Sequence, residues 1–175
     1  MSNIQGTDSL KYGFYQVQLH TFALQRRRGE ETTGQLPASK MNMKLEMSNV
    51  GLKVGDQLKI KGEILHDAER FQIDLGYDVE DLALHFNPRF HDDTDGAVVV
   101  CNSKTAGLWG DEKREMHNPL QRGTHVKIVL KLAGDMFEVE LPDGHEIQFP
   151  NRVNLDVINY IRITGDFKLT CLKIG

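Results

Sequence analysis

The stretch Leu84–Phe90 reads Leu-His-Phe-Asn-Pro-Arg-Phe, in which apolar and polar residues alternate. Successive side chains of a β-strand point to opposite faces, so this alternation predicts a strand with one buried face. The other face then carries His85, Asn87 and Arg89 in a row. An imidazole, an amide and a guanidinium offer several hydrogen-bond donors and fewer acceptors at fixed spacing. Such a row predicts binding of a neutral molecule with several hydroxyl groups, which means a sugar.

The same alternation recurs from residue 42 onward and predicts further strands. They are expected at residues 58–62, 71–75, 98–102, 126–131, 137–141, 147–149, 161–163 and 167–169. Turn residues such as Pro142-Asp143-Gly144 separate them, and no helical period is present. Many short strands between turn signals are typical of an all-β, two-sheet antiparallel sandwich. With 175 residues and no internal repeat, we expect one folded domain.

The composition is that of a soluble globular protein, with 39% hydrophobic and 26% charged residues. A net charge of −4 gives no basic surface for nucleic acid, which is therefore not an expected partner. No apolar run approaches the roughly 20 residues that a helix needs to cross a bilayer, so membrane insertion is not expected either.

Residues 1–41 differ in character from the rest of the chain. Five basic and three acidic residues give them a net charge of +2, whereas the remaining 16 basic and 22 acidic residues give −6. We predict that residues 1–41 form a mobile N-terminal extension and that residues 42–175 form the domain. The alternating piece Tyr15–Leu19 and the basic run Arg26–Arg28 leave a second interpretation open, an extra strand or a basic interaction arm.

The two cysteines, Cys101 and Cys171, lie in apolar segments that are typical of strands. We expect buried thiols there and no disulfide, as in proteins made in a reducing compartment. The first ten residues lack the basic start and the continuous apolar stretch of a secretory signal. We therefore expect cytoplasmic synthesis without a signal peptide, and also an extracellular location reached by unconventional secretion.

A second group of polar residues follows the first stretch. Asn102 ends a strand-like run, and the loop 92–96 allows a hairpin that places this run beside the first strand. Trp109 comes next, and Glu112 and Arg114, two residues apart, share a face. An indole offers a flat apolar surface for the C–H face of a sugar, and arginines hold a carboxylate in place.

Read in order, His-x-Asn-Pro-Arg, Val-x-Asn and Trp-Gly-x-Glu-x-Arg resemble the motif of the galectin carbohydrate-recognition domain. The resemblance covers about residues 42–175 and includes similar segments at 55–56, 100–103, 149–152 and 158–160. It implies a jelly-roll sandwich and a lectin for β-galactosides, such as lactose and N-acetyllactosamine-type glycans. It implies no enzymatic activity, no cofactor and no metal ion.

The resemblance also gives each motif residue a role. At the axial 4-hydroxyl of galactose we expect His85, Asn87 and Arg89. At the 6-hydroxyl we expect Asn102 and Glu112, and under the galactose ring Trp109. At the second sugar we expect Glu112, Arg89 and Arg114.

Two aspartates are expected to support this motif. Asp95 is expected to orient Arg89, and Asp93 stands where several relatives have histidine. The charge of Asp93 lies beside the second sugar, which leaves the preference among oligosaccharides open. A calcium-binding interpretation of the loop 92–96 fails, because the first and twelfth positions of an EF-hand loop would lack acidic residues.

A lectin with one site cross-links glycoconjugates only as an oligomer. The resemblance implies a homodimer that pairs through the strands at both chain ends, near residues 45–47 and 171–174. The extension lies directly upstream of this edge and could block or modify the pairing.

Two other functions stay open. One is a galectin-like scaffold that has lost sugar binding and acts through protein contacts. The other is a glycoside hydrolase, which would need two carboxylates about 5–5.5 Å or about 6.5–9.5 Å apart. Glu112, set between Arg89 and Arg114, is poorly suited to donate a proton.

Overall fold

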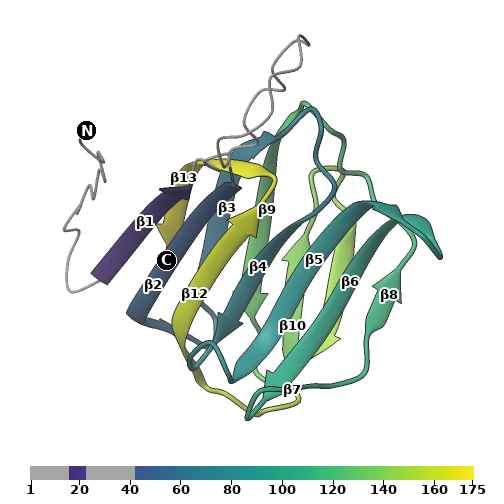
Figure 1. Cartoon of the computed structure of the whole chain (residues 1–175). Helices are drawn as coiled ribbons and strands as arrows, with labels where there is room; N and C mark the ends of the chain where they lie inside the picture. The colour runs from purple at the N-terminus through teal and green to yellow at the C-terminus, as the bar shows by residue number, and fades with distance from the viewer. Residues whose placement is uncertain (1–15, 23–41) are drawn as a thin grey trace, which may run out of the picture.

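The computed structural model describes residues 16–22 and 42–175, which form β-strands and no helix (Figure 1). The strands are β1 (Gln16–Phe22), β2 (Asn42–Lys53), β3 (Gln57–Ile64), β4 (Phe71–Gly76), β5 (Leu82–Asp92), β6 (Gly96–Thr105), β7 (Leu108–Trp109), β8 (Lys113–Glu115), β9 (His125–Leu132), β10 (Met136–Glu140), β11 (Glu146–Pro150), β12 (Val157–Gly165) and β13 (Phe167–Ile174). The predicted all-β class is confirmed. In this part of the chain there is accordingly no helix long and apolar enough to cross a membrane.

The strands form two antiparallel sheets that pack face to face (Figure 1). The first sheet has the order β1-β2-β12-β4-β5-β6-β7, and β8 also pairs with β6. The second sheet has the order β11-β10-β9-β3-β13. The predicted jelly-roll sandwich is therefore confirmed, and β5 lies well inside the first sheet, between β4 and β6.

The core fills the space between the sheets with side chains from alternate strand positions. In β3 the buried residues alternate with the exposed Lys59 and Lys61. Phe71 of β4 stacks on Phe167 of β13 with ring centroids 4.8 Å apart, which joins the two sheets. Burial of one such side chain contributes about 1.5–3 kcal/mol, so the alternation that predicted the strands also supplies their stability.

One strand, β1, lies within the predicted extension. It pairs with β2 in an antiparallel register that runs from Gln16 opposite Ser48 to Phe22 opposite Asn42. Residues 16–22 therefore form the extra strand that the sequence left open as a second interpretation. The predicted mobility of the extension otherwise concerns residues 1–15 and 23–41, which lie outside the described residues, and it stays a prediction.

Both cysteines are free thiols, as predicted. Cys101 is buried in β6, and this burial raises the pKa of its thiol to about 12. The predicted burial of Cys171 is not found. Cys171 lies in β13, an edge strand of the second sheet, and is only half-buried.

We predict that Gly62→Ala destabilises the sandwich. A Cβ atom at this position would lie 2.3 Å from Cζ of Phe167 and 2.6 Å from the carbonyl oxygen of Lys168. The ring and the backbone of β13 would both have to shift, which costs about 1–3 kcal/mol. Urea denaturation measures the resulting loss in the free energy of unfolding.

Lys61→Ala, at the neighbouring exposed position of the same strand, is the matched control for this substitution. Its free energy of unfolding should stay within about 0.5 kcal/mol of the wild-type value. Equal stability of the two variants would contradict the close approach of β3 and β13.

Candidate functional site

Three neighbouring strands of the first sheet carry the polar row found in the sequence. The register places His85 of β5 opposite Asp74 of β4 on one side and opposite Asn102 of β6 on the other. Trp109 and Arg114 reach the same region because β7 and β8 both pair with β6. Residues far apart in the chain thus meet on one face of the sheet.

A groove of about 470 Å³ opens on this face. Its lining residues are Arg70, Gln72, His85, Asn87, Arg89, Asn102, Trp109, Gly110 and Glu112. Six of the seven residues predicted to contact a sugar therefore line a single groove. The seventh, Arg114, stands behind Glu112 and binds its carboxylate.

His85 is held by a buried carboxylate. Its Nδ1 lies 2.6 Å from Oδ1 of Asp74, whose side chain has no exposed surface. Burial of Asp74 opposes its ionisation, but the hydrogen bond with His85 and the charge of Arg162 outweigh burial and hold the pKa of Asp74 below its ordinary value. An ionised carboxylate accepts a hydrogen bond from a proton-bearing Nδ1. Asp74 thereby leaves Nε2 of His85 as the ring nitrogen that faces a ligand.

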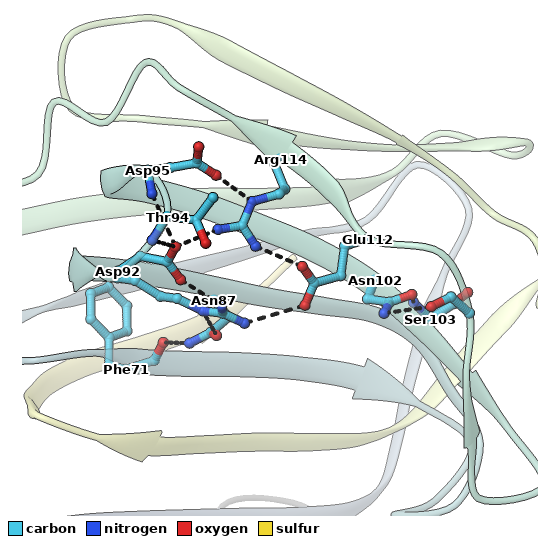
Figure 2. A network of polar contacts seen from close by, with 11 residues as sticks. Phe71, Asn87, Asp92, Thr94, Asp95, Asn102, Ser103, Glu112 and Arg114 are labelled. Carbon is cyan, nitrogen blue, oxygen red and sulfur yellow. Dashed lines mark hydrogen bonds and ion pairs between the residues drawn. The ribbon is translucent and has the colours of Figure 1, made fainter.

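The amide of Asn87 is fixed with the help of the proline that follows it. The register of β4 and β5 places Pro88 opposite Phe71, and proline has no N–H to donate across the ladder. The carbonyl of Phe71 accepts a hydrogen bond from Nδ2 of Asn87 instead, at 2.7 Å (Figure 2). The oxygen of the amide is therefore turned toward Arg89, whose Nε donates to it at 3.0 Å.

The guanidinium of Arg89 is held by two carboxylates as well. Nη1 donates to Oδ2 of Asp92 at 2.9 Å, and Nη2 donates to Oε1 of Glu112 at 3.4 Å. The hydrogen bond from Arg89 lowers the pKa of Asp92 to about 2. The prediction that Asp95 orients Arg89 is wrong. The partner is Asp92, because the backbone N–H groups of Thr94 and Asp95 bind the other oxygen of Asp92 and turn the loop.

Arg114 connects three carboxylates on the outer side of this cluster (Figure 2). Its Nε donates to Oδ2 of Asp95 at 2.6 Å, its Nη1 to Oε2 of Glu112 at 2.7 Å and its Nη2 to Oδ1 of Asp92 at 2.7 Å. The hydrogen bonds with Asp95 and Glu112 raise the pKa of Arg114 above its ordinary value. Glu112 therefore lies between two guanidinium groups, as the sequence predicted.

Asn102 lies at the other end of the groove. Its Nδ2 donates to the carbonyl oxygen of Gly110 at 2.9 Å, and its Oδ1 accepts from the backbone N–H of Ser103 at 2.8 Å. Arg152 follows β11 of the second sheet, and its Nη1 donates to the carbonyl oxygen of Asp111 at 2.8 Å. The contacts of Asn102 with Gly110 and of Arg152 with Asp111 hold the loop between β7 and β8, which carries Glu112 into the groove.

Trp109 forms the apolar wall of the groove. The residue is 51% exposed, although it is large and aromatic. The centroid of its ring system lies 4.8 Å from that of His85, and the two planes meet at 59°. A flat apolar surface beside a row of polar groups matches a molecule with one C–H face and several hydroxyl groups.

Asp93 does not line this groove. It lines a neighbouring hollow of about 410 Å³, which shares Arg70 and Arg89 with the groove. Its expected influence on a second sugar stays a prediction. Although carboxylates gather here, no three or more His, Cys, Asp or Glu side chains in the described part of the chain are grouped so as to hold a metal ion.

Sequence reasoning missed several residues that support the site, among them Asp74, Asp92 and Arg152. A signal for Asp74 was present, because it shares the polar face of the strand 71–75 with Gln72. Asp92 is one of three aspartates in a short loop, and only the loop geometry distinguishes it. Arg152 comes from the other sheet, and no local pattern indicates its contact with the loop.

We predict that Asp74→Asn lowers the free energy of unfolding at neutral pH by about 3–5 kcal/mol, because it leaves Arg162 without its buried counter-charge. The pKa of Asp74 is lowered by folding, so its contribution is present above the unfolded value of about 3.9. That contribution is lost as the pH falls through the lower folded-state pKa. Urea denaturation over a pH series should therefore show the difference from wild type shrinking below about pH 4.

Asp156→Asn removes an exposed carboxylate and is the matched control. Its stability should stay within about 0.5 kcal/mol of wild type at each pH. A deficit of Asp74→Asn that is the same at every pH would contradict the role of the buried charge.

Known proteins resemble the chain over the same region. The family model for galactoside-binding lectins matches residues 42–174. Galectin-1 of the goat, Capra hircus, is 46% identical over 128 residues, which cover 73% of this chain and 95% of that protein. The structure of CG-16, a homodimeric agglutinin from chicken liver, matches with a TM-score of 0.73 and 39% identity, covering 75% of this chain and 99% of that one. A toad ovary galectin in complex with thio-digalactose matches with a TM-score of 0.72 and 31% identity, covering 75% and 98%.

The matched region contains both sheets apart from β1 and all the motif residues that surround the groove. A family model that spans most of the chain, together with relatives of this identity and a shared sandwich, confirms the resemblance seen in the motif. The chain therefore belongs to the galectins, the family of galactoside-binding lectins.

Proposed function

We propose that the protein binds β-galactosides, such as lactose and N-acetyllactosamine-type glycans, in the groove of the first sheet and performs no reaction on them. The observation that carries the proposal is the polar row of β5, held in place by its neighbours, beside the exposed ring of Trp109. Membership of the family and the thio-digalactose bound by the toad ovary galectin support the same class of ligand.

The row retains hydrogen-bonding capacity for a ligand. Arg89 has five N–H groups, and its bonds to Asn87, Asp92 and Glu112 engage three of them. His85 keeps its Nε2, because Asp74 binds its other nitrogen. A sugar hydroxyl is both a donor and an acceptor, so one hydroxyl can donate to His85 while it accepts from Arg89.

The axial 4-hydroxyl of galactose is the group that this row would select. When the C–H face of the ring stacks on Trp109, an axial hydroxyl projects from the ring plane toward His85 and Arg89. An equatorial hydroxyl, as in glucose, would leave these polar groups desolvated and unpaired. Each unpaired group costs about 1–3 kcal/mol, which favours galactosides over glucosides.

We expect lactose to bind saturably to the full chain in a calorimetric titration or in a titration followed by Trp109 fluorescence. Arg89→Ala should abolish this binding, because it removes a donor and also frees the carboxylates of Asp92 and Glu112. Lys127→Ala, at an exposed position on β9 of the other sheet, is the control and should bind as wild type does. No lactose binding by the wild-type chain would instead favour the sugar-silent scaffold.

Cellobiose should bind at least about tenfold more weakly than lactose, since its 4-hydroxyl is equatorial. The same titration cell and the same protein sample serve for both disaccharides. Equal affinity for the two would contradict selection by the axial hydroxyl, even if both sugars bind.

The hydrolase alternative finds little support in the carboxylates. A general acid must carry a proton at the working pH. The pKa of Asp92 is lowered to about 2 by Arg89, and oxygens of Asp95 and Glu112 accept from Arg114. Prolonged incubation with lactose should therefore release neither free galactose nor free glucose.

The proposal includes a homodimer that cross-links glycoconjugates, because one site in each chain cannot bridge two ligands. CG-16, the similar chicken protein, is described as a homodimeric agglutinin, which supports this part. The proposal also places synthesis in the cytosol and action outside the cell after unconventional secretion. The free thiols of Cys101 and Cys171 suit synthesis in a reducing compartment.

A further inference from the structure

The outermost strand of the first sheet comes from the N-terminal part of the chain (Figure 1). β1 pairs with residues 42–48 of β2, while the other edge of β2 pairs with β12. Without β1, the backbone N–H and C=O groups on this edge of β2 would have no ladder partner in the sheet. Such an edge is a template for pairing with another chain.

The part of β2 that β1 covers is its regular part. From Asn49 the strand departs from regular geometry, since Asn49 and Gly51 have φ values of 60° and 67° and the register with β12 shifts there. Residues 42–48 contain no proline, and the charges of Lys44 and Glu46 compensate each other in an ion pair of 2.8 Å. The devices that usually protect an edge, namely proline, a bulge or an unpaired charge, are therefore weak in this stretch.

A second copy of the chain is the partner that suits this edge. Two β2 strands can pair antiparallel about a two-fold axis, so that each residue on one copy meets its counterpart in reciprocal fashion. β13 forms the adjacent edge of the second sheet and contacts β2. Its Leu172 and Ile174 are only partly buried, so a second copy at β2 would also meet an apolar surface on β13.

The connection between β1 and β2 is unusual for two antiparallel neighbours. Hairpin loops have about two to five residues, whereas here residues 23–41 separate the two strands. Covalent connection of β1 to β2 makes their pairing intramolecular, with an effective concentration of about millimolar. At micromolar protein concentration, pairing within the chain should therefore prevail over pairing with a second copy.

We propose that β1 of the same chain covers the outer edge of β2, on which a second copy would otherwise pair, and thereby controls dimerisation. The capped chain is a monomer, and the homodimer of the proposed function is the form that assembles when release of β1 exposes the edge. This inference rests on the proposed function only where cross-linking is concerned, because strand pairing does not depend on sugar binding. Cross-linking activity would then be controlled by the N-terminal part of the chain.

Sedimentation velocity of the full chain at micromolar concentration tests the proposal with two variants. The release variant, Gln18→Pro with Leu19→Pro, removes N–H groups from the middle of β1 and should weaken its pairing with β2. The locked variant, Gln16→Cys with Ser48→Cys, joins two residues that are opposite in the register, a separation that a disulfide can span. Thr32→Pro with Thr33→Pro places the same two prolines between β1 and β2 and is the matched control.

We expect wild type, control and oxidised locked variant to sediment as monomers and the release variant as a dimer, with an apparent dissociation constant at least about tenfold below that of wild type. Equal masses of wild type and release variant, whether both are monomers or both are dimers, would overturn the proposal. A dimer of the oxidised locked variant would overturn it as well. If thermal melting shows that the double-proline chain does not fold, single Leu19→Pro replaces it in the comparison.

Lactose titration of the same samples separates this inference from the proposed function. The groove lies on β4 to β7, so all four proteins should bind lactose with equal affinity. Agglutination of beads that carry β-galactosides should then require the release variant. Monomer and dimer as expected, without lactose binding in any sample, would leave the β2 edge established and refute the galactoside proposal alone.

Discussion

The buried charge of Asp74 is the interaction on which the candidate site depends. A carboxylate without exposed surface loses several kcal/mol of hydration free energy, and only hydrogen bonds and opposite charge can compensate this loss. His85 occupies one oxygen of Asp74, and Gln72 and Arg162 donate to the other. These groups come from β4, β5 and β12, which are neighbours in one sheet. The need to compensate the charge of Asp74 therefore favours this register of β4, β5 and β12 and also orients the imidazole of His85.

The charges at the other end of the groove act differently because they are more exposed. An isolated surface ion pair contributes only about 0–1 kcal/mol to stability, so the pairs around Arg89 and Arg114 add little to the fold one by one. They share Asp92 and Glu112, however, and each ordered side chain restricts the next. Their main effect falls on binding, because groups that are already in position lose less conformational entropy when a ligand arrives. The buried charges around Asp74 thus stabilise the fold, whereas the exposed ion pairs of Arg89 and Arg114 hold the side chains of the groove in position.

The features that the sequence predicted are those that local patterns encode. Period-two alternation was enough for the sandwich and for the common face of His85, Asn87 and Arg89, while the motif resemblance added Trp109 and Glu112. Contacts between distant segments were not accessible in this way, such as the contact of Arg162 with Asp74, 88 residues apart. The same limit applies to β1, since its alternation is compatible with both a strand and a mobile segment, and only pairing with β2 decides between them. The error over Asp95 arose from the loop turn, which side-chain chemistry alone does not reveal.

The orientation of Asn87 depends on the residue at the next position, Pro88. Any other residue there would restore a backbone N–H opposite Phe71 and bring a second donor to the carbonyl that now orients Asn87. Asn87 could then rotate its amide away from Arg89 although Asn87 itself had not been substituted. The orientation of the polar groups in the groove thus depends partly on Pro88, which is buried on the opposite face of the strand. A search for altered ligand preference that varies only the residues lining the groove would leave this determinant untouched.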